Sequence, residues 1–267
     1  MNDKFLKKEN YLFYIFNDKN NEYSSYVSIR TDFIFISKVI VQDTELFFSI
    51  DLFSLLFKFD LNSNLSITLI KKLILENENE ITKLIKDIYT YRKKCFHDAL
   101  LEDNAIKAVG LHDNSDLFEQ YSLMVNNFLE DETKSFTNKS LYKCGMYVYS
   151  QIEDGSCYVN LVTLIEKISL SIKDNVMSNL NNQLINKLNK NQELLVYRGS
   201  SNKNLNGFSY TLSYETAIRF AKRFYREKAF ISKYKVNIKD VLMYITDRNE
   251  EEIVTKRAIL LDRILLK

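Results

Sequence analysis

The strongest structural pattern in this sequence lies in three stretches of its last third: ELLVYRG at residues 193–199, GFSYTLSYETAIRFA at 207–221 and EEEIV at 250–254. The apolar run of the first stretch predicts a short buried strand, Leu194–Tyr197, that ends at Arg198. The third stretch is an acidic cluster that continues directly into an apolar pair, Ile253 and Val254, which also predicts a strand.

The middle stretch predicts an amphipathic helix. The helix is expected over Tyr214–Arg226, and its apolar face is made of Ala217, Phe220, Ala221 and Phe224. Apolar and β-branched runs that follow it predict further strands at Ala229–Val236, Val241–Ile245 and Ala258–Leu266. The last third of the chain is therefore expected to be β-rich with one embedded helix.

The first 100 residues carry no chemical motif. Aromatic and β-branched residues predict a small antiparallel sheet with strands at Tyr11–Phe16, Tyr23–Ile29 and Asp32–Val41. From about Ser66 the apolar residues follow helical spacing, which predicts one long helix or two helices that break near Glu76–Glu80. Further helices are expected at Asp116–Leu129, Leu141–Gln151 and Tyr158–Leu188.

The composition excludes several common classes of site. The five glycines fit neither G-x-G-x-x-G nor G-x-x-x-x-G-K-[ST], so a Rossmann dinucleotide site and a P-loop are excluded. Two histidines without an H-E-x-x-H motif, and three cysteines without metal-ligand spacing, lead us to expect no metal. The cysteines are typical of free thiols in a reducing compartment, and no secretory or membrane-spanning segment is evident, so we expect a cytoplasmic location.

Charge is distributed unevenly along the chain. From Ile185 to Lys267, 17 Lys and Arg residues stand against 9 Asp and Glu residues, whereas the remainder has 20 against 26. A basic region suits an anionic ligand, although a solvated basic face is the simpler interpretation. Basic residues alternate with aromatic ones between Arg219 and Lys235, which is typical of surfaces that bind a phosphate backbone and stack bases. A non-enzymatic nucleic-acid-binding module is therefore one candidate function.

Taken in order, the three stretches resemble the mono-ADP-ribosyltransferase superfamily, in the subclass with Arg, Ser-Thr-Ser and Glu-x-Glu motifs. Arg198 matches the first motif, Ser209–Thr211 occupies the place of the second, and Glu250-x-Glu252 matches the third. The match covers about Tyr197 to Val254. Tyr210 replaces the central threonine of the second motif, and three consecutive glutamates leave the register of the third open by one residue.

The resemblance implies an enzyme that uses NAD as the ADP-ribose donor. Cleavage of the bond between nicotinamide and ribose develops positive charge on the ribose, as in glycoside hydrolysis. Glu252 directly precedes the strand and is the candidate carboxylate that stabilises this charge, with Ser209 orienting it. Arg198 is the candidate for binding the dinucleotide phosphates, and Gly199 permits close approach of the backbone.

Other residues of the three motifs have implied roles at the NAD site. The candidate aromatic platforms for nicotinamide are Tyr210, Tyr214, Phe224 and Tyr225, and Thr211 is grouped with the NAD-binding residues. In protein-modifying relatives, a carboxylate at the position of Glu250 would polarise or deprotonate the acceptor. A glutamate at position 250 resembles the motif of arginine-modifying relatives. RNA and DNA remain candidate acceptors beside protein side chains.

The implied fold is α+β: a split β-sheet ADP-ribosyltransferase-like domain with outer helices, preceded by a small α+β N-terminal domain. The expected boundaries are residues 1–100 for the accessory domain and 101–267 for the catalytic domain. The resemblance points to a toxin of a toxin–antitoxin or phage-defence system, or to an effector, with an antitoxin or inhibitor protein as candidate partner and no membrane partner. An NAD glycohydrolase, with water as the acceptor at the same site, is the enzymatic alternative.

Overall fold

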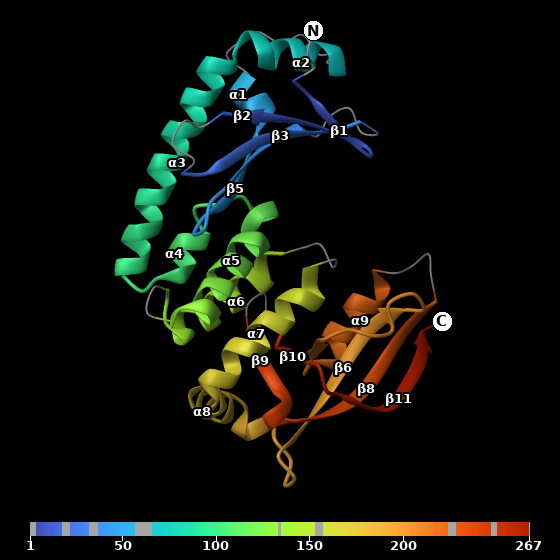
Figure 1. The fold of residues 1–267 in the computed structure, drawn as a ribbon. Coiled ribbons are helices and arrows are strands. Elements are labelled where there is room, and N and C mark those ends of the chain that lie inside the picture. Colours follow the sequence, from blue (N-terminus) through green and yellow to red (C-terminus); the bar gives the residue numbers. More distant parts are fainter. Residues whose placement is uncertain are drawn as a thin grey trace. The chain divides into compact units, whose positions relative to one another are not determined.

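The computed structural model describes residues 4–17, 22–31, 37–56, 66–132, 135–152, 157–223, 228–246 and 250–266. The chain divides into two compact units. Unit 1 comprises residues 1–144 and 151–153, and unit 2 comprises residues 145–150 and 154–267. Helices combined with two antiparallel sheets (Figure 1) make this an α+β protein, as the sequence predicts.

Unit 1 contains a five-stranded antiparallel sheet whose strands follow one another in chain order. Its strands are β1 (Leu6–Lys8), β2 (Tyr11–Phe16), β3 (Ser24–Arg30), β4 (Ser37–Gln42) and β5 (Phe47–Asp51). Side chains alternate between the two faces, so that Leu12, Tyr14 and Phe16 of β2 are buried. The predicted N-terminal sheet is present, with residues 32–36 of its third predicted strand outside the described part.

The helices of unit 1 follow this sheet. They are α1 (Leu52–Leu56), α2 (Ile67–Glu76), α3 (Glu78–Leu101), α4 (Ala105–Val109) and α5 (Leu117–Glu130). The predicted break falls at Asn77, between α2 and α3. Because α3 continues to Leu101, the expected boundary at residue 100 lies inside a helix; the chain divides instead within α6 (Asn138–Gln151).

Unit 2 begins with helices and ends with a second sheet. The predicted helical region becomes α7 (Tyr158–Ser171) and α8 (Lys173–Leu184), which break at Ile172. The strands are β6 (Glu193–Ser201), β7 (Ser209–Thr211), β8 (Ala229–Asn237), β9 (Val241–Ile245), β10 (Glu252–Thr255) and β11 (Ile259–Leu266). In the described residues, no helix has both the length and the apolar character that a membrane crossing requires.

The sheet of unit 2 consists of two three-stranded halves joined by a weak seam. Its strand order is β11-β8-β6-β7-β10-β9, and all paired strands are antiparallel. Whereas β6 pairs with β8 along its whole length, β6 and β7 pair only at Tyr197 and Thr211. The halves β11-β8-β6 and β7-β10-β9 therefore meet in the backbone at a single residue pair.

The embedded helix α9 (Tyr214–Lys222) packs on β6 and β8 (Figure 1). Ser213 caps it by accepting a hydrogen bond from the backbone N–H of Thr216. The helix approaches β6 closely at Gly199, where a Cβ atom would clash with the backbone oxygen of Ala217 and the backbone nitrogen of Ala221. A residue without a side chain at position 199 is thus required by the packing of α9 on the sheet.

We predict that Gly199→Ala lowers the free energy of unfolding by about 1–3 kcal/mol, because α9 must move away from β6 to admit the methyl group. Urea or thermal unfolding measures the change. The matched control is Gly110→Ala, since a Cβ there lies 3.1 Å from its nearest neighbour, the backbone oxygen of Ile106. A Gly199→Ala protein as stable as wild type would show that the contact between α9 and β6 does not depend on this glycine.

Candidate active site

The predicted carboxylate, Glu252, is the first residue of β10. It pairs with Thr211 of β7 on one side and with Ile245 of β9 on the other. The residue before it, Glu251, has a φ of 45°, in the left-handed region that residues other than glycine seldom adopt. The strand therefore starts after a sharp local turn, and the neighbouring glutamate side chains bind different partners.

Two hydroxyl groups donate hydrogen bonds to the same oxygen of Glu252. The Oγ of Ser209 on β7 and the Oη of Tyr149 on α6 both bind Oε1, the latter at 3.0 Å. Burial raises the pKa of Glu252 above its usual range, and these two hydrogen bonds oppose the rise. The charge of Glu250 raises the same pKa further, whereas the charge of Arg198 lowers it. The predicted contact between Ser209 and Glu252 is thus present.

The other two glutamates of the cluster bind cations. Glu250 lies 3.2 Å from the guanidinium of Arg219 on α9, and its backbone oxygen accepts a 2.6 Å hydrogen bond from Thr211 Oγ1. Glu251 forms an ion pair with Lys187. Of the three glutamates, Glu252 is the one that contacts Ser209, which is the register that the sequence analysis preferred.

One row of paired residues crosses three strands beside Glu252. Tyr197 of β6 pairs with Thr211 of β7, which pairs with Glu252 of β10, so the three side chains lie on the same face of the sheet. Tyr214 of α9 packs edge-on against Tyr197, with ring centroids 5.3 Å apart. Two strand spacings separate Glu252 from Tyr197, or about 10 Å. The predicted platform residue Tyr214, which is 40% exposed, therefore belongs to the same side as Glu252.

Tyr210 lies on the opposite face of the sheet. Successive residues of a strand point to opposite sides, so Tyr210 points away from the side of Ser209 and Thr211. It is buried, its Oη donates to the backbone oxygen of Gly207 at 2.9 Å, and its ring packs against Tyr234. The structure thus gives Tyr210 a place in the core rather than beside Glu252. The other aromatic candidates, Phe224 and Tyr225, lie outside the described residues.

Arg198 links the two halves of the sheet across the seam. Its Nη1 donates to the backbone oxygen of Ser209 at 2.7 Å, so it links β6 to β7 beside their single backbone pair. Its Nη2 donates to Asn204 Oδ1 at 3.1 Å and to the backbone oxygen of Asn206 at 3.3 Å. Its Nε is buried without a hydrogen-bond partner in the described structure. Nη1 and Nη2 therefore bind oxygens of the folded chain, and Nε has no partner among the described residues.

The remaining predicted NAD-binding residues have structural partners. Gly199 faces the backbone of α9, as described above. Thr211 is buried, donates to the backbone oxygen of Glu250 and accepts from the backbone N–H of Ser213 at 3.1 Å. The packing of α9 on the sheet explains the glycine at position 199. The hydrogen bonds to Glu250 and Ser213 explain the threonine at position 211.

Tyr149 is the contact of Glu252 that sequence reasoning missed. Only 7% of its surface is exposed, and its ring packs against that of Tyr158 at the start of α7, with centroids 5.2 Å apart. It lies 103 residues before Glu252 in the sequence. No motif or periodicity in the sequence connects the two residues.

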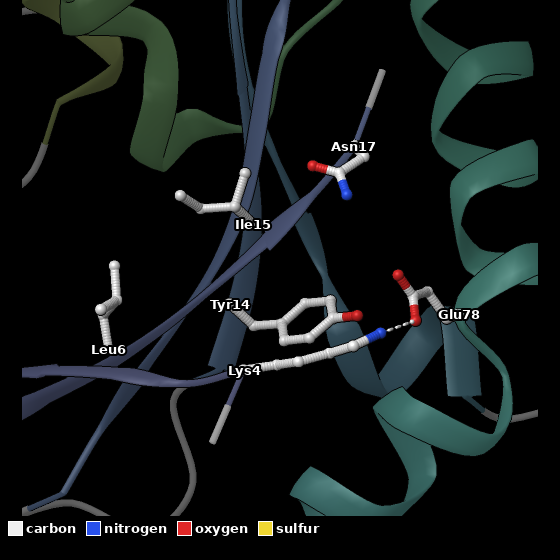
Figure 2. Close-up of a pocket in the computed structure, with 6 residues that line it drawn as sticks. All are labelled: Lys4, Leu6, Tyr14, Ile15, Asn17 and Glu78. Atoms are coloured by element: carbon white, nitrogen blue, oxygen red, sulfur yellow. Dashed lines mark hydrogen bonds and ion pairs between the residues drawn. The ribbon is translucent and has the colours of Figure 1, made fainter. Parts of the chain in front are cut away.

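A surface hollow lies elsewhere, in unit 1 (Figure 2). Its lining residues are Lys4, Leu6, Tyr14, Ile15, Asn17 and Glu78. Lys4 donates to Glu78 at 3.0 Å beside the ring of Tyr14, and this ion pair accounts for the charges at the hollow. The residues that line it include none of the predicted site residues. In the described part of the chain, no group of three His, Cys, Asp or Glu side chains is arranged to hold a metal ion.

Comparison of the chain with protein-family models, with curated proteins and with solved structures gave no match in any of the three. The function is therefore inferred from the geometry of the site itself and from the motif resemblance.

We predict that Glu252→Gln stabilises the protein near neutral pH. Because the pKa of Glu252 is raised in the folded state, its charge costs stability above that raised pKa, and the cost disappears as the pH falls below the ordinary value of 4.5. The amide retains an oxygen that accepts from Ser209 and Tyr149. Calorimetric melting should therefore show a higher Tm for the variant near neutral pH and a shrinking difference toward about pH 4.

The matched control for this experiment is Glu251→Gln, which removes one charge at the neighbouring position, where the side chain is 37% exposed and paired with Lys187. This variant should not gain stability near neutral pH, because an exposed ion pair is worth about 0–1 kcal/mol. A wild-type Tm equal to that of Glu252→Gln throughout the pH range would contradict the assigned burial cost.

Proposed function

We propose that this protein is an NAD-dependent mono-ADP-ribosyltransferase that modifies a macromolecule. The observation that carries the proposal is the asymmetric environment of the Glu252 carboxylate. Oε1 is held by Ser209 and Tyr149, whereas no described residue donates a hydrogen bond to Oε2. The Glu252 side chain is only partly buried, and we take Oε2 as the oxygen that meets a ligand.

Such a carboxylate suits the chemistry that the motifs imply. The bond between nicotinamide and C1 of the ribose breaks, and both bonding electrons leave with nicotinamide, which departs as a neutral molecule. The positive charge then lies on the ribose, next to the proposed position of Oε2, where a fixed negative charge stabilises it. A lone pair of the acceptor forms the new bond to C1, and the acceptor loses a proton. Ser209 and Tyr149 hold the carboxylate in place throughout.

The geometry of Arg198 is compatible with an anionic ligand. Its Nε is a buried donor without a partner in the described residues, and its Nη2 binds the segment that contains Asn204 and Asn206. A phosphate of NAD would engage these two groups, while Nη1 keeps its bond to the backbone of Ser209. Tyr214 is the aromatic candidate on the side of the sheet that carries Glu252.

The two-part sheet supports the proposed fold. The expectation is a split β-sheet with the NAD site at the division, and the single pair Tyr197–Thr211 divides this sheet into three-stranded halves. Ser209 and Glu252 belong to one half, and Arg198 belongs to the other. The strands that carry the three motifs therefore lie beside the seam where backbone pairing is weakest.

The acceptor would be engaged through Glu250. Its carboxylate is paired with Arg219 at 3.2 Å, and only 17% of its side chain is exposed. An arginine side chain of a target protein would replace Arg219 at this carboxylate with the same ion-pair geometry, which favours a protein acceptor over RNA or DNA. The proposed biological setting is a cytoplasmic toxin or an effector, with an antitoxin or inhibitor protein as a partner.

We predict that Glu252→Gln lowers the rate of NAD cleavage by about 10²–10³-fold, because the amide carries no charge to stabilise the ribose cation. Release of nicotinamide, followed by chromatography, measures this rate. Glu251→Gln is the matched control and should retain wild-type activity, since Glu251 binds Lys187 rather than the proposed site. Full activity of the Glu252→Gln variant would refute the assignment.

The reaction class is tested by incubating the protein with a cell lysate and NAD labelled on the adenylate. We expect label in a fraction that protease removes and that RNase and DNase leave intact. Transfer should be lost in Glu252→Gln, and it should fall more than NAD hydrolysis does in Glu250→Gln. NAD loss without any labelled macromolecule would favour the glycohydrolase alternative. Salt-dependent binding of RNA or DNA without NAD cleavage would favour the nucleic-acid-binding module.

A further inference from the structure

We propose that Tyr149 is a positioning residue that holds Glu252 Oε1 and thereby orients the carboxylate toward the substrate. This role lies outside the three motifs, and it rests on the proposed function of Glu252. Tyr149 belongs to the last turn of α6, an element that the motif resemblance does not use. Its Oη donates to Glu252 Oε1 at 3.0 Å.

The tyrosine is itself fixed by its surroundings. Its side chain is almost fully buried, and its ring lies at 57° to that of Tyr158. A buried aromatic side chain has few alternative rotamers, so its hydroxyl group has a defined direction. Burial and the neighbouring carboxylate raise the pKa of Tyr149, which therefore stays protonated and acts as a donor throughout the working pH range.

A second donor on Oε1 has two consequences. It favours the charged form of a carboxyl whose pKa is raised by burial. It also restricts rotation of the carboxylate, because Ser209 of β7 and Tyr149 of α6 bind the same oxygen from different elements. With Oε1 held in this way, Oε2 is the oxygen left to meet the substrate.

The other groups that act on this carboxyl are few. The charge of Glu250, two residues before Glu252, raises the pKa of Glu252, and the charge of Arg198 on β6 lowers it. Tyr158 of α7 acts on Tyr149 and raises its pKa. Of the groups that lower the pKa of Glu252, Tyr149 and Ser209 do so through hydrogen bonds, and Tyr149 can lose its hydroxyl with almost no change in shape.

The test compares wild-type protein with Tyr149→Phe across the pH range. A hydrogen bond to a charged group is worth enough to change a pKa by about one unit or more. We therefore expect the acidic limb of kcat/KM for NAD cleavage to move to higher pH by about one unit. At pH values on that limb, the variant should be about tenfold slower. Tyr147→Phe, the same change on the same helix, is the control and should leave the pH profile unmoved.

A second measurement does not depend on activity. Carbon-13 NMR of glutamate-labelled protein gives the pKa of the Glu252 carboxyl, with its signal assigned by its loss in Glu252→Gln. The pKa should be higher in Tyr149→Phe than in wild type and in Tyr147→Phe. An unchanged pKa overturns the proposal, and so does a fall in kcat at all pH values without movement of the acidic limb. Absence of NAD cleavage by wild type refutes the proposed function, while the NMR titration still tests the contact.

Discussion

Hydrogen-bond donors stabilise a partly buried carboxylate in a folded protein by replacing the water that it has lost. Glu252 obtains these donors from two elements, Ser209 on β7 and Tyr149 on α6. The rest of the site follows from this arrangement, because both donors bind Oε1 and thereby leave Oε2 for a ligand. The left-handed residue Glu251 separates Glu252 from Glu250, so that one carboxylate binds hydroxyls and the other binds Arg219. Neighbouring acidic residues thus have different environments and different proposed tasks.

The seam in the sheet of unit 2 is the second constraint on the site. Backbone pairing between β6 and β7 stops after Tyr197 and Thr211, and Arg198 continues the connection through its side chain to the backbone of Ser209. The same guanidinium thus binds the strand that carries Ser209 and has one buried donor, Nε, without a partner among the described residues. Unsatisfied buried donors are rare in folded proteins and are consistent with a site that a ligand completes. A single residue would link the integrity of the fold to NAD binding.

Local patterns in the sequence predicted the helices of unit 2 and its strands except β7, because helices and strands follow from short-range patterns. The contact between Ser209 and Glu252, which are 43 residues apart, was instead implied by the family resemblance. The same local patterns offered a break near Glu76–Glu80 as one of two alternatives, and they predicted the helix that became α9. Tyr210 could have been placed by strand alternation, since Ser209 and Thr211 flank it and point to the other face. Gly199 was interpreted as space for a ligand, whereas the structure uses that space for α9. Tyr149 could not be predicted, because its contact with Glu252 joins segments 103 residues apart without a shared pattern.

We infer that Glu252 meets the ribose of NAD through Oε2, which binds no described residue. A crystal structure of the Glu252→Gln variant with NAD would show this contact, because the variant is expected to cleave the dinucleotide about 10²–10³-fold more slowly. We expect the nicotinamide ribose within hydrogen-bond distance of the side chain at position 252, and a phosphate at the Nε or Nη2 of Arg198. A dinucleotide bound away from both residues, or no binding at saturating NAD, would contradict it.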